Sequence, residues 1–185
     1  MSVLKTFNKL PELNTANIML VGSDVSDLEK LARSIMEENK SFNVNVRLAQ
    51  SLPLPVENED SRPRIDLLVL MVNLRSSYSL SLAESSLQYI DPHYFLGKVY
   101  FLATGARSSH LSSDLLPSLR LLSASTRSPV LFADLESDSG RLTVAHRFLT
   151  LLKIAAGLEP GASALFLNTL LRGAPPPSTN EDPLN

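Results

Sequence analysis

The sequence predicts an α/β fold of three layers, in which helices cover both faces of a doubly wound, mostly parallel sheet of about five strands. Short apolar runs rich in strand-forming residues alternate along the chain with stretches of helical periodicity. The run at 65–74, IDLLVLMVNL, is almost continuously apolar, which is typical of a central strand covered on both faces. A short link joins the first helix to the second strand, which favours a right-handed parallel crossover between parallel strands.

The first strand and helix lie within residues 17–36. The run at 18–21 is a short strand, and Gly22 ends it. The apolar residues that follow recur at i, i+3, i+4, i+7 and i+8, which predicts an amphipathic helix with these residues on its inner face: Leu28, Leu31, Ala32, Ile35 and Met36. Ser26 and Glu29 form an S-x-x-E pattern, which predicts a capping box at the start of this helix.

The other elements follow in chain order. Before the first strand, Val3, Leu4, Phe7 and Leu10 recur at roughly helical spacing. Strands are predicted at 42–48, 65–74, 99–103 and 130–133, and a proline-rich acidic loop at 52–64. Helices are predicted at 79–90 with a capping box at Ser81 and Glu84, around 115–122, at 141–156 with Leu142 inward, and at 163–172. We expect one domain over residues 1–172 and a disordered tail over 173–185.

Composition excludes several classes of protein. The net charge is −2 and no cluster of Lys and Arg is present, which argues against a stand-alone DNA-binding module. The chain contains no cysteine, so neither disulfides nor thiolate metal sites can form. No signal peptide and no apolar run of the ~20 residues that span a bilayer are evident, so we expect a cytosolic or nuclear protein.

A strand, a glycine, a turn and a helix are also the layout of a phosphate-binding loop, G-x-x-x-x-G-K-[ST]. Counting from Gly22, Asp27 stands at the second glycine, Leu28 at the lysine and Glu29 at the serine or threonine. Asp27 places a side chain where phosphate needs bare backbone N–H groups, and Leu28 cannot neutralise phosphate. Glu29 brings a negative charge to the place of the hydroxyl that would hold magnesium. The scaffold is predicted to be retained and the ligand site emptied.

The other parts of a GTPase are missing too. No D-x-x-G occurs, and where N-K-x-D should read guanine the chain has Thr104, Gly105, Ala106 and Arg107. The link after the first helix is too short for a switch I segment and an antiparallel edge strand. His93, His110 and His146 have no second ligand at i+3 or i+4, and we interpret Asp134 and Glu136 as solvated turn residues. No catalytic residue, cofactor or metal ligand is predicted.

Two apolar stretches are candidates for binding another protein. Tyr94, Phe95 and Leu96 lie in a short turn before a strand, where they could equally be core. The final helix is apolar nearly all round, so one packed face leaves the rest for a second surface, in this chain or another: Leu165, Phe166, Leu167 and Leu170.

Five segments carry a resemblance to a known family: MSVLKTFNKLPELNTANIMLVGS, AQSLPLP, RPRIDLLVLMVNLRSSYSL, FLGKVYFLATGAR and GASALFLNTLLR. Over residues 1 to about 172 the chain resembles the centromere protein M family. The resemblance implies a small-GTPase (Ras-like) fold that lacks switch elements and no longer binds nucleotide, a pseudo-GTPase. It also implies a non-catalytic structural subunit of the constitutive inner kinetochore network, at the centromere in the nucleus. The implied direct partner is centromere protein I, an α-solenoid, in a complex with centromere proteins H and K. The alternative is a divergent small GTPase that binds nucleotide through non-standard ligands.

Overall fold

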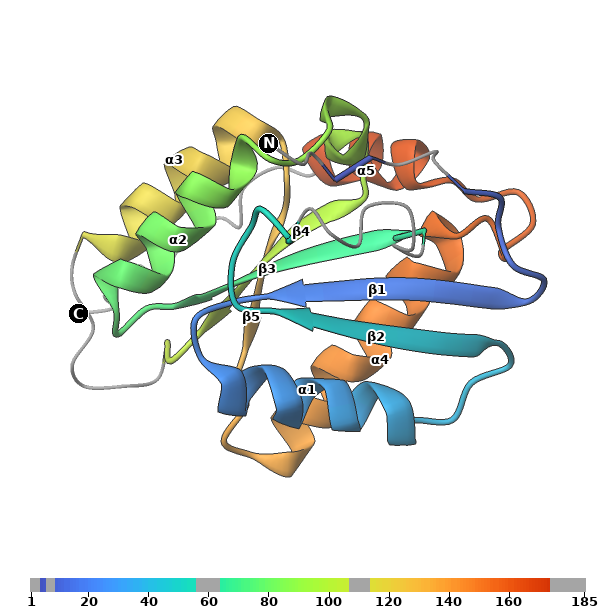
Figure 1. Cartoon of the computed structure of the whole chain (residues 1–185), viewed down its shortest axis with the longest axis horizontal. Coiled ribbons are helices and arrows are strands. Elements are labelled where there is room, and N and C mark those ends of the chain that lie inside the picture. Colours follow the sequence, from blue (N-terminus) through green and yellow to red (C-terminus); the bar gives the residue numbers. More distant parts are fainter. Residues whose placement is uncertain (1–3, 6–8, 56–63, 107–113, 174–185) are drawn as a thin grey trace, which may run out of the picture.

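The computed structural model describes residues 4–5, 9–55, 64–106 and 114–173, and within them the chain forms one five-stranded sheet (Figure 1). The strand order is β2-β1-β3-β4-β5, and every neighbouring pair is parallel. The strands are β1 (Thr15–Val21), β2 (Asn43–Ala49), β3 (Leu67–Asn73), β4 (Val99–Thr104) and β5 (Val130–Ala133). This is a doubly wound sheet, as predicted, and it contains no antiparallel strand among the described residues.

Helices cover both faces of the sheet and complete the three layers (Figure 1). They are α1 (Val25–Glu37), α2 (Ser77–Leu87), the short 3₁₀ helix η2 (Pro92–Phe95), α3 (Leu115–Thr126), α4 (Asp138–Ala155) and α5 (Ala164–Gly173). Side chains of β1 alternate between two cores: Ile18 and Leu20 pack with α1 and α4, whereas Met19 and Val21 pack with α2 and α3. The α/β prediction is therefore confirmed.

The central strand is β3, as the sequence predicts. Every residue from Leu67 to Val72 is buried, and successive side chains enter the two cores in turn. A strand covered by helices on both faces has no polar face, which explains the continuous apolar run. Because β3 lies between β1 and β4, it holds together the two halves of the sheet.

The predicted helix starts are wrong in detail. Helix α1 begins at Val25, and the side chain of Asp24 accepts the Asp27 N–H at 3.2 Å, so Ser26 and Glu29 do not form its cap. In α2 the cap residue is Ser76, which places the predicted capping box of Ser81 and Glu84 inside the helix.

Two side chains that were predicted to face inward are exposed. Met36 in α1 is 52% exposed, and Leu142 in α4 is 49% exposed. Helical spacing alone overestimated the width of the buried stripe, because each helix packs on the sheet along a narrower contact than its apolar residues could cover.

The N-terminal segment, the proline-rich loop and the C-terminal segment were only partly predictable. Leu4 is not helical: it forms a parallel bridge with Ile90, and its N–H donates to the Tyr89 carbonyl at 2.8 Å. Most of the predicted proline-rich loop (56–63) and the tail from residue 174 lie outside the described residues. Helix α5 is present as predicted and lies beside the segment that leads into β4 (Figure 1).

Candidate functional site

The loop after β1 lies where a nucleotide-binding protein of this fold would hold phosphate, and here it is closed. Only Gly22, Ser23 and Asp24 separate β1 from α1. The Gly22 N–H donates to the Ala49 carbonyl at 3.1 Å, so it continues the ladder to β2. A Cβ at Gly22 would lie 3.0 Å from the Met71 Cβ. Packing against β3 therefore accounts for the glycine without any ligand.

The three residues at the degenerate motif positions all lie in the first turns of α1. Leu28, which replaces the phosphate-binding lysine, is 2% exposed and packs in the core under α1. Glu29 faces solvent. At the helix N-terminus the Asp24 carboxylate already accepts a backbone N–H, that of Asp27. A phosphate would have to displace this carboxylate and overcome its charge.

Asp27 is a buried acid at the start of α1. It is 6% exposed, and Lys30 bridges it to Glu136 with N–O distances of 3.6 Å and 3.7 Å. Burial raises the pKa of Asp27, and the charge of Asp24 raises it further, while Lys30 opposes both effects. The chain thus tolerates an acid at the point where an anionic ligand would need a cation.

The loop after β4, which reads the base in a GTPase, packs against the loop after β3. The Leu74 N–H donates to the carbonyl of Thr104, which is 4% exposed. Gly105 has a φ of +74°, and a Cβ there would lie 3.0 Å from the Asn73 Oδ1. Arg107 lies outside the described residues, so its predicted place in the degenerate base-reading loop stays a prediction.

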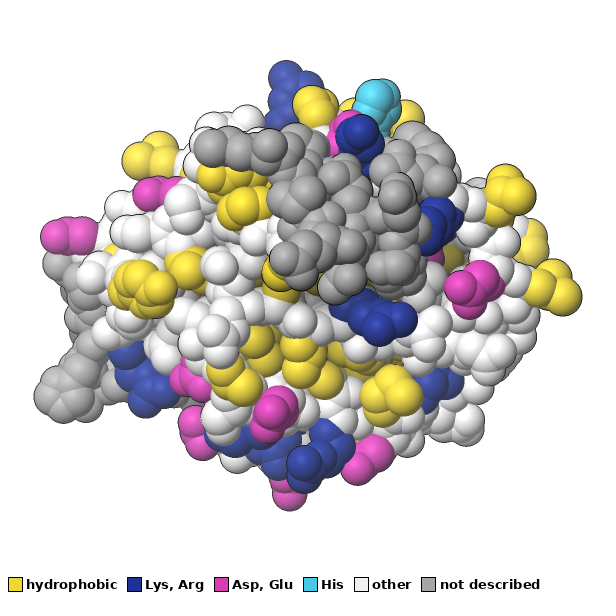
Figure 2. All heavy atoms as spheres, viewed as in Figure 1, with side chains coloured by type: hydrophobic (Ala, Val, Ile, Leu, Met, Phe, Trp, Pro, Cys, Tyr) yellow, Lys and Arg dark blue, Asp and Glu magenta, His cyan; other side chains and the backbone are white. Residues whose placement is uncertain are grey.

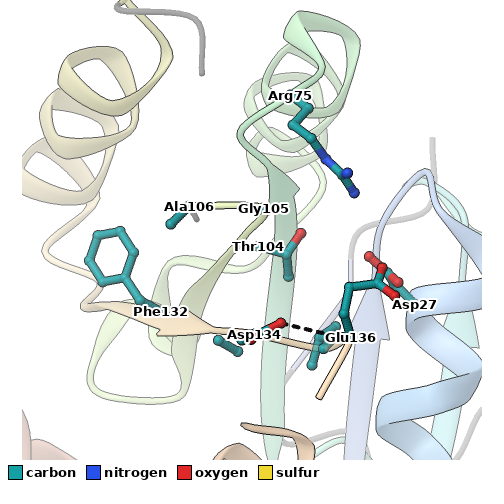
Figure 3. Close-up of a pocket in the computed structure, with 10 residues that line it drawn as sticks. Asp27, Arg75, Thr104, Gly105, Ala106, Phe132, Asp134 and Glu136 are labelled. Atoms are coloured by element: carbon teal, nitrogen blue, oxygen red, sulfur yellow. Dashed lines mark hydrogen bonds between the residues drawn. The ribbon is translucent and has the colours of Figure 1, made fainter. Parts of the chain in front are cut away.

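These loops surround a pocket of about 480 Å³ at the carboxyl ends of the strands (Figure 3). Asp27, Asp134 and Glu136 line one side, and Asp134 accepts the Glu136 N–H at 3.1 Å. Arg75 reaches in from the opposite side, and Phe132 lies at the far end of the pocket from Asp27 (Figure 3). Among the described residues, three carboxylates and one arginine line the pocket, which makes it a poor match for a triphosphate.

Within the described part of the chain, no three His, Cys, Asp or Glu residues lie close enough together to hold a metal ion. In the same residues, no helix is long and apolar enough to cross a membrane.

The predicted protein-binding residues of the turn before β4 divide between core and surface. Tyr94 is fully buried, and the single proton of its hydroxyl is shared between two acceptors, the Ile65 carbonyl at 3.2 Å and the Lys5 carbonyl at 3.3 Å. Burial raises the pKa of this phenol, which stays a neutral donor. Phe95 is half-buried against the core, and Leu96 is 49% exposed. Tyr94 is thus a core residue, and Leu96 the exposed member.

The exposed residues of α5 adjoin this turn. Leu165 and Phe166 are 52% and 56% exposed, Leu167 is half-buried, and the side chain of Leu170 lies outside the described set. Gly97 joins the two stretches: its φ is +95°, and a Cβ there would lie 2.2 Å from the Ala164 carbonyl oxygen. Only a glycine allows this close approach. Gly97 was not predicted to matter, although a glycine directly after an apolar turn was a usable signal.

We define the α5 surface as Phe95, Leu96, Leu165, Phe166 and Leu167. It lies beside the amino ends of the strands, because Gly97 is two residues before the start of β4, whereas the 480 Å³ pocket lies at the carboxyl ends. The surface and the pocket therefore lie at opposite ends of the strands.

Comparison with known proteins places the chain in one family. Residues 1–174 match the family model described as Centromere protein M (CENP-M). The chain is 48% identical to Centromere protein M of Homo sapiens, over 98% of this chain and 99% of the relative. It is 47% identical to the Danio rerio protein of that name, over 93% of both chains. With the Xenopus laevis protein the identity is 42%, over 92% of this chain and 95% of the relative. The chain belongs to the centromere protein M family.

Proposed function

We propose that this protein is a non-catalytic structural subunit of the constitutive inner kinetochore network at centromeres in the nucleus. In this role it docks on centromere protein I and stabilises it, in a complex with centromere proteins H and K, and so supports kinetochore assembly and chromosome segregation. The centromeric role is supported by membership of the family, and the partners are those that the sequence resemblance implies.

The observation that carries the docking role is the α5 surface. Its three most exposed members, Leu96, Leu165 and Phe166, each have about half of their area in water. Burying apolar surface in an interface contributes about 25 cal/mol of binding free energy per Å². Exposed leucine and phenylalanine side chains brought together from two elements are typical of the anchors of an interface, which should bury more than about 1,000 Å² in total.

The non-catalytic part of the proposal is supported by the edge where a GTPase would bind nucleotide. Leu28 is packed in the core, Asp24 caps α1, and Asp27 is buried close to Glu136. Each of these features removes an interaction that phosphate or magnesium requires.

The alternative, a divergent GTPase with non-standard ligands, is favoured by one observation, the 480 Å³ pocket at the carboxyl ends of the strands. Arg75 is the cation among the described residues of this pocket, and it could contact a phosphate. Removal of Arg75 should abolish nucleotide binding if the alternative holds, and should leave assembly unchanged if the docking proposal holds.

The experiment that tests the proposal is co-expression of the full chain with centromere proteins H, I and K, followed by size-exclusion chromatography. We expect one complex of the four chains, and a lower yield of soluble centromere protein I when this chain is omitted. Full recovery of centromere protein I without this chain would contradict a stabilising role.

A further inference from the structure

Strand β2 forms one edge of the sheet, and half of its backbone groups point away from the molecule. The Asn43 N–H donates to the Asn14 carbonyl, and the Ala49 carbonyl accepts from the Gly22 N–H. The backbone N–H and C=O groups of the odd-numbered residues of β2 therefore point toward β1. In a parallel strand the even-numbered residues then direct both their N–H and C=O groups outward. These residues are Val44, Val46 and Leu48. No described residue is hydrogen-bonded to their outward groups.

A groove of about 360 Å³ runs between this edge and α1. Apolar side chains flank it, including Met36, which is 52% exposed, and Leu48, which is 44% exposed. Figure 2 shows a row of hydrophobic side chains at the level between β2 and α1. Met36 belongs to the apolar stripe of α1, and about half of its surface is exposed to solvent, so it is available to a neighbour along the edge.

The charges of the groove have one sign. Arg33 and Arg47 line it, and no Asp or Glu is among the described residues that do so. Because side chains alternate along a strand, Arg47 lies on the opposite face of the sheet from Val46 and Leu48. A strand added here would therefore meet apolar side chains and Arg33 on the α1 face, and Arg47 on the other face.

We propose that the β2 edge is a docking site for an extended segment of a partner protein, in which apolar and acidic residues alternate. The segment would add to the sheet next to β2, hydrogen-bonded to Val44, Val46 and Leu48, with its apolar residues over Met36 and its acidic residues beside Arg47. An arginine on an exposed edge discourages uncharged strands, so it also selects for an acidic one. This site is independent of the α5 surface and shares no residue with it.

The test uses the full chain and a short fluorescently labelled peptide that alternates valine and glutamate, with binding measured by anisotropy. Val46→Pro removes the outward N–H donor and no hydrogen bond to β1. It should weaken binding at least about fivefold, the effect of one lost hydrogen bond. Arg47→Glu should reverse the preference, so that a peptide with lysine in place of glutamate binds better. Arg120→Glu, at an exposed arginine of α3, is the matched control. It should change neither the affinity for the glutamate peptide nor the preference between the two peptides.

Several results would overturn the proposal. The wild-type chain could show no saturable binding, or it could bind the lysine peptide as well as the glutamate peptide. Folded Val46→Pro could bind unchanged. If Val46→Pro does not fold, Arg47→Glu decides the question, and an unaltered preference rejects the site. A dimer of this chain that Val46→Pro dissociates would also reject it, since a second copy would then be the occupant. None of these results depends on binding of centromere protein I.

Discussion

Replacing two leucines of the α5 surface should weaken binding to centromere protein I and leave the domain folded. The change is Leu96→Ala together with Leu165→Ala. The two residues come from different elements, the end of η2 and the start of α5, and Gly97 brings these elements into contact. If both residues are anchors of one interface, the double variant should lose the sum of their contributions.

The expected magnitude follows from their exposure. Leucine to alanine removes about three carbons, worth about 0.8 kcal/mol each when they are fully buried. Leu96 is 49% exposed and Leu165 is 52% exposed, so docking can bury only about half of each side chain. We therefore expect a loss of about 1.2 kcal/mol per leucine, and about 2.4 kcal/mol for both, which is about a 50-fold rise in Kd.

The assay is a titration of the purified variant into centromere protein I in complex with H and K, with thermal unfolding measured in parallel. The buried halves of the two leucines contribute to folding, so Tm should fall while the transition stays cooperative. Leu142→Ala in α4 is a matched control, because Leu142 is also 49% exposed but lies outside the α5 surface. It should lower Tm about as much as Leu96→Ala and leave the Kd unchanged.

Two results would refute this reasoning. A double variant that folds and binds within about twofold of wild type would show that the α5 surface is not the docking site. A double variant that loses its cooperative transition would show that these leucines belong to the core, despite their exposure.

Three further predictions concern stability. Asp66→Ala removes the acceptor of the Asn17 N–H at 3.0 Å and of the Arg64 Nε at 2.6 Å, so it should lower the free energy of unfolding in urea by about 2–4 kcal/mol. Gly97→Ala should cost about 1–3 kcal/mol through its positive φ and should also weaken partner binding, because the new Cβ displaces α5 from η2; a circular-dichroism melt and the same titration measure the two effects. Because burial raises the pKa of Asp27, its charged form destabilises the fold, so Asp27→Asn should raise Tm at neutral pH. That gain should shrink as the pH falls through the raised pKa and vanish below 3.8, where the unfolded carboxyl is protonated as well; melts over a pH series test this.

Much of the fold could be predicted because each element carries a local signal. The apolar run of β3 and the short link from α1 to β2 indicate a parallel sheet by themselves, and the structure has both features. The caps were less predictable, because Asp24 and Ser26 are both good cap residues and an offset of two residues decides between them. Exposure of Met36 and Leu142 depends on how far each helix tilts over the sheet, which a periodic pattern does not contain.

In the candidate sites, too, some features could be predicted from the sequence and others could not. The departure from the phosphate-loop motif could be followed residue by residue in the sequence, and the structure places Leu28 in the core. The junction of η2 with α5 could not be predicted, because the contact between Gly97 and Ala164 joins residues far apart in the chain. Tyr94 and Leu96 have similar neighbours in the sequence, yet one is buried and the other exposed. Only the packing of η2 beside β4 separates them.

The central claim is that this domain has a GTPase-like fold, does not bind nucleotide and acts by docking on another protein. Its most direct test is calorimetric titration of GTP and GDP with magnesium into the purified chain. We predict no heat of binding and no shift of Tm at millimolar nucleotide. The reason is that Leu28, which is packed in the core, stands in place of the phosphate-binding lysine, and the Asp24 carboxylate caps α1. Saturable binding, even with a Kd in the tens of micromolar, would contradict the account, since other residues would then have to rebuild the site.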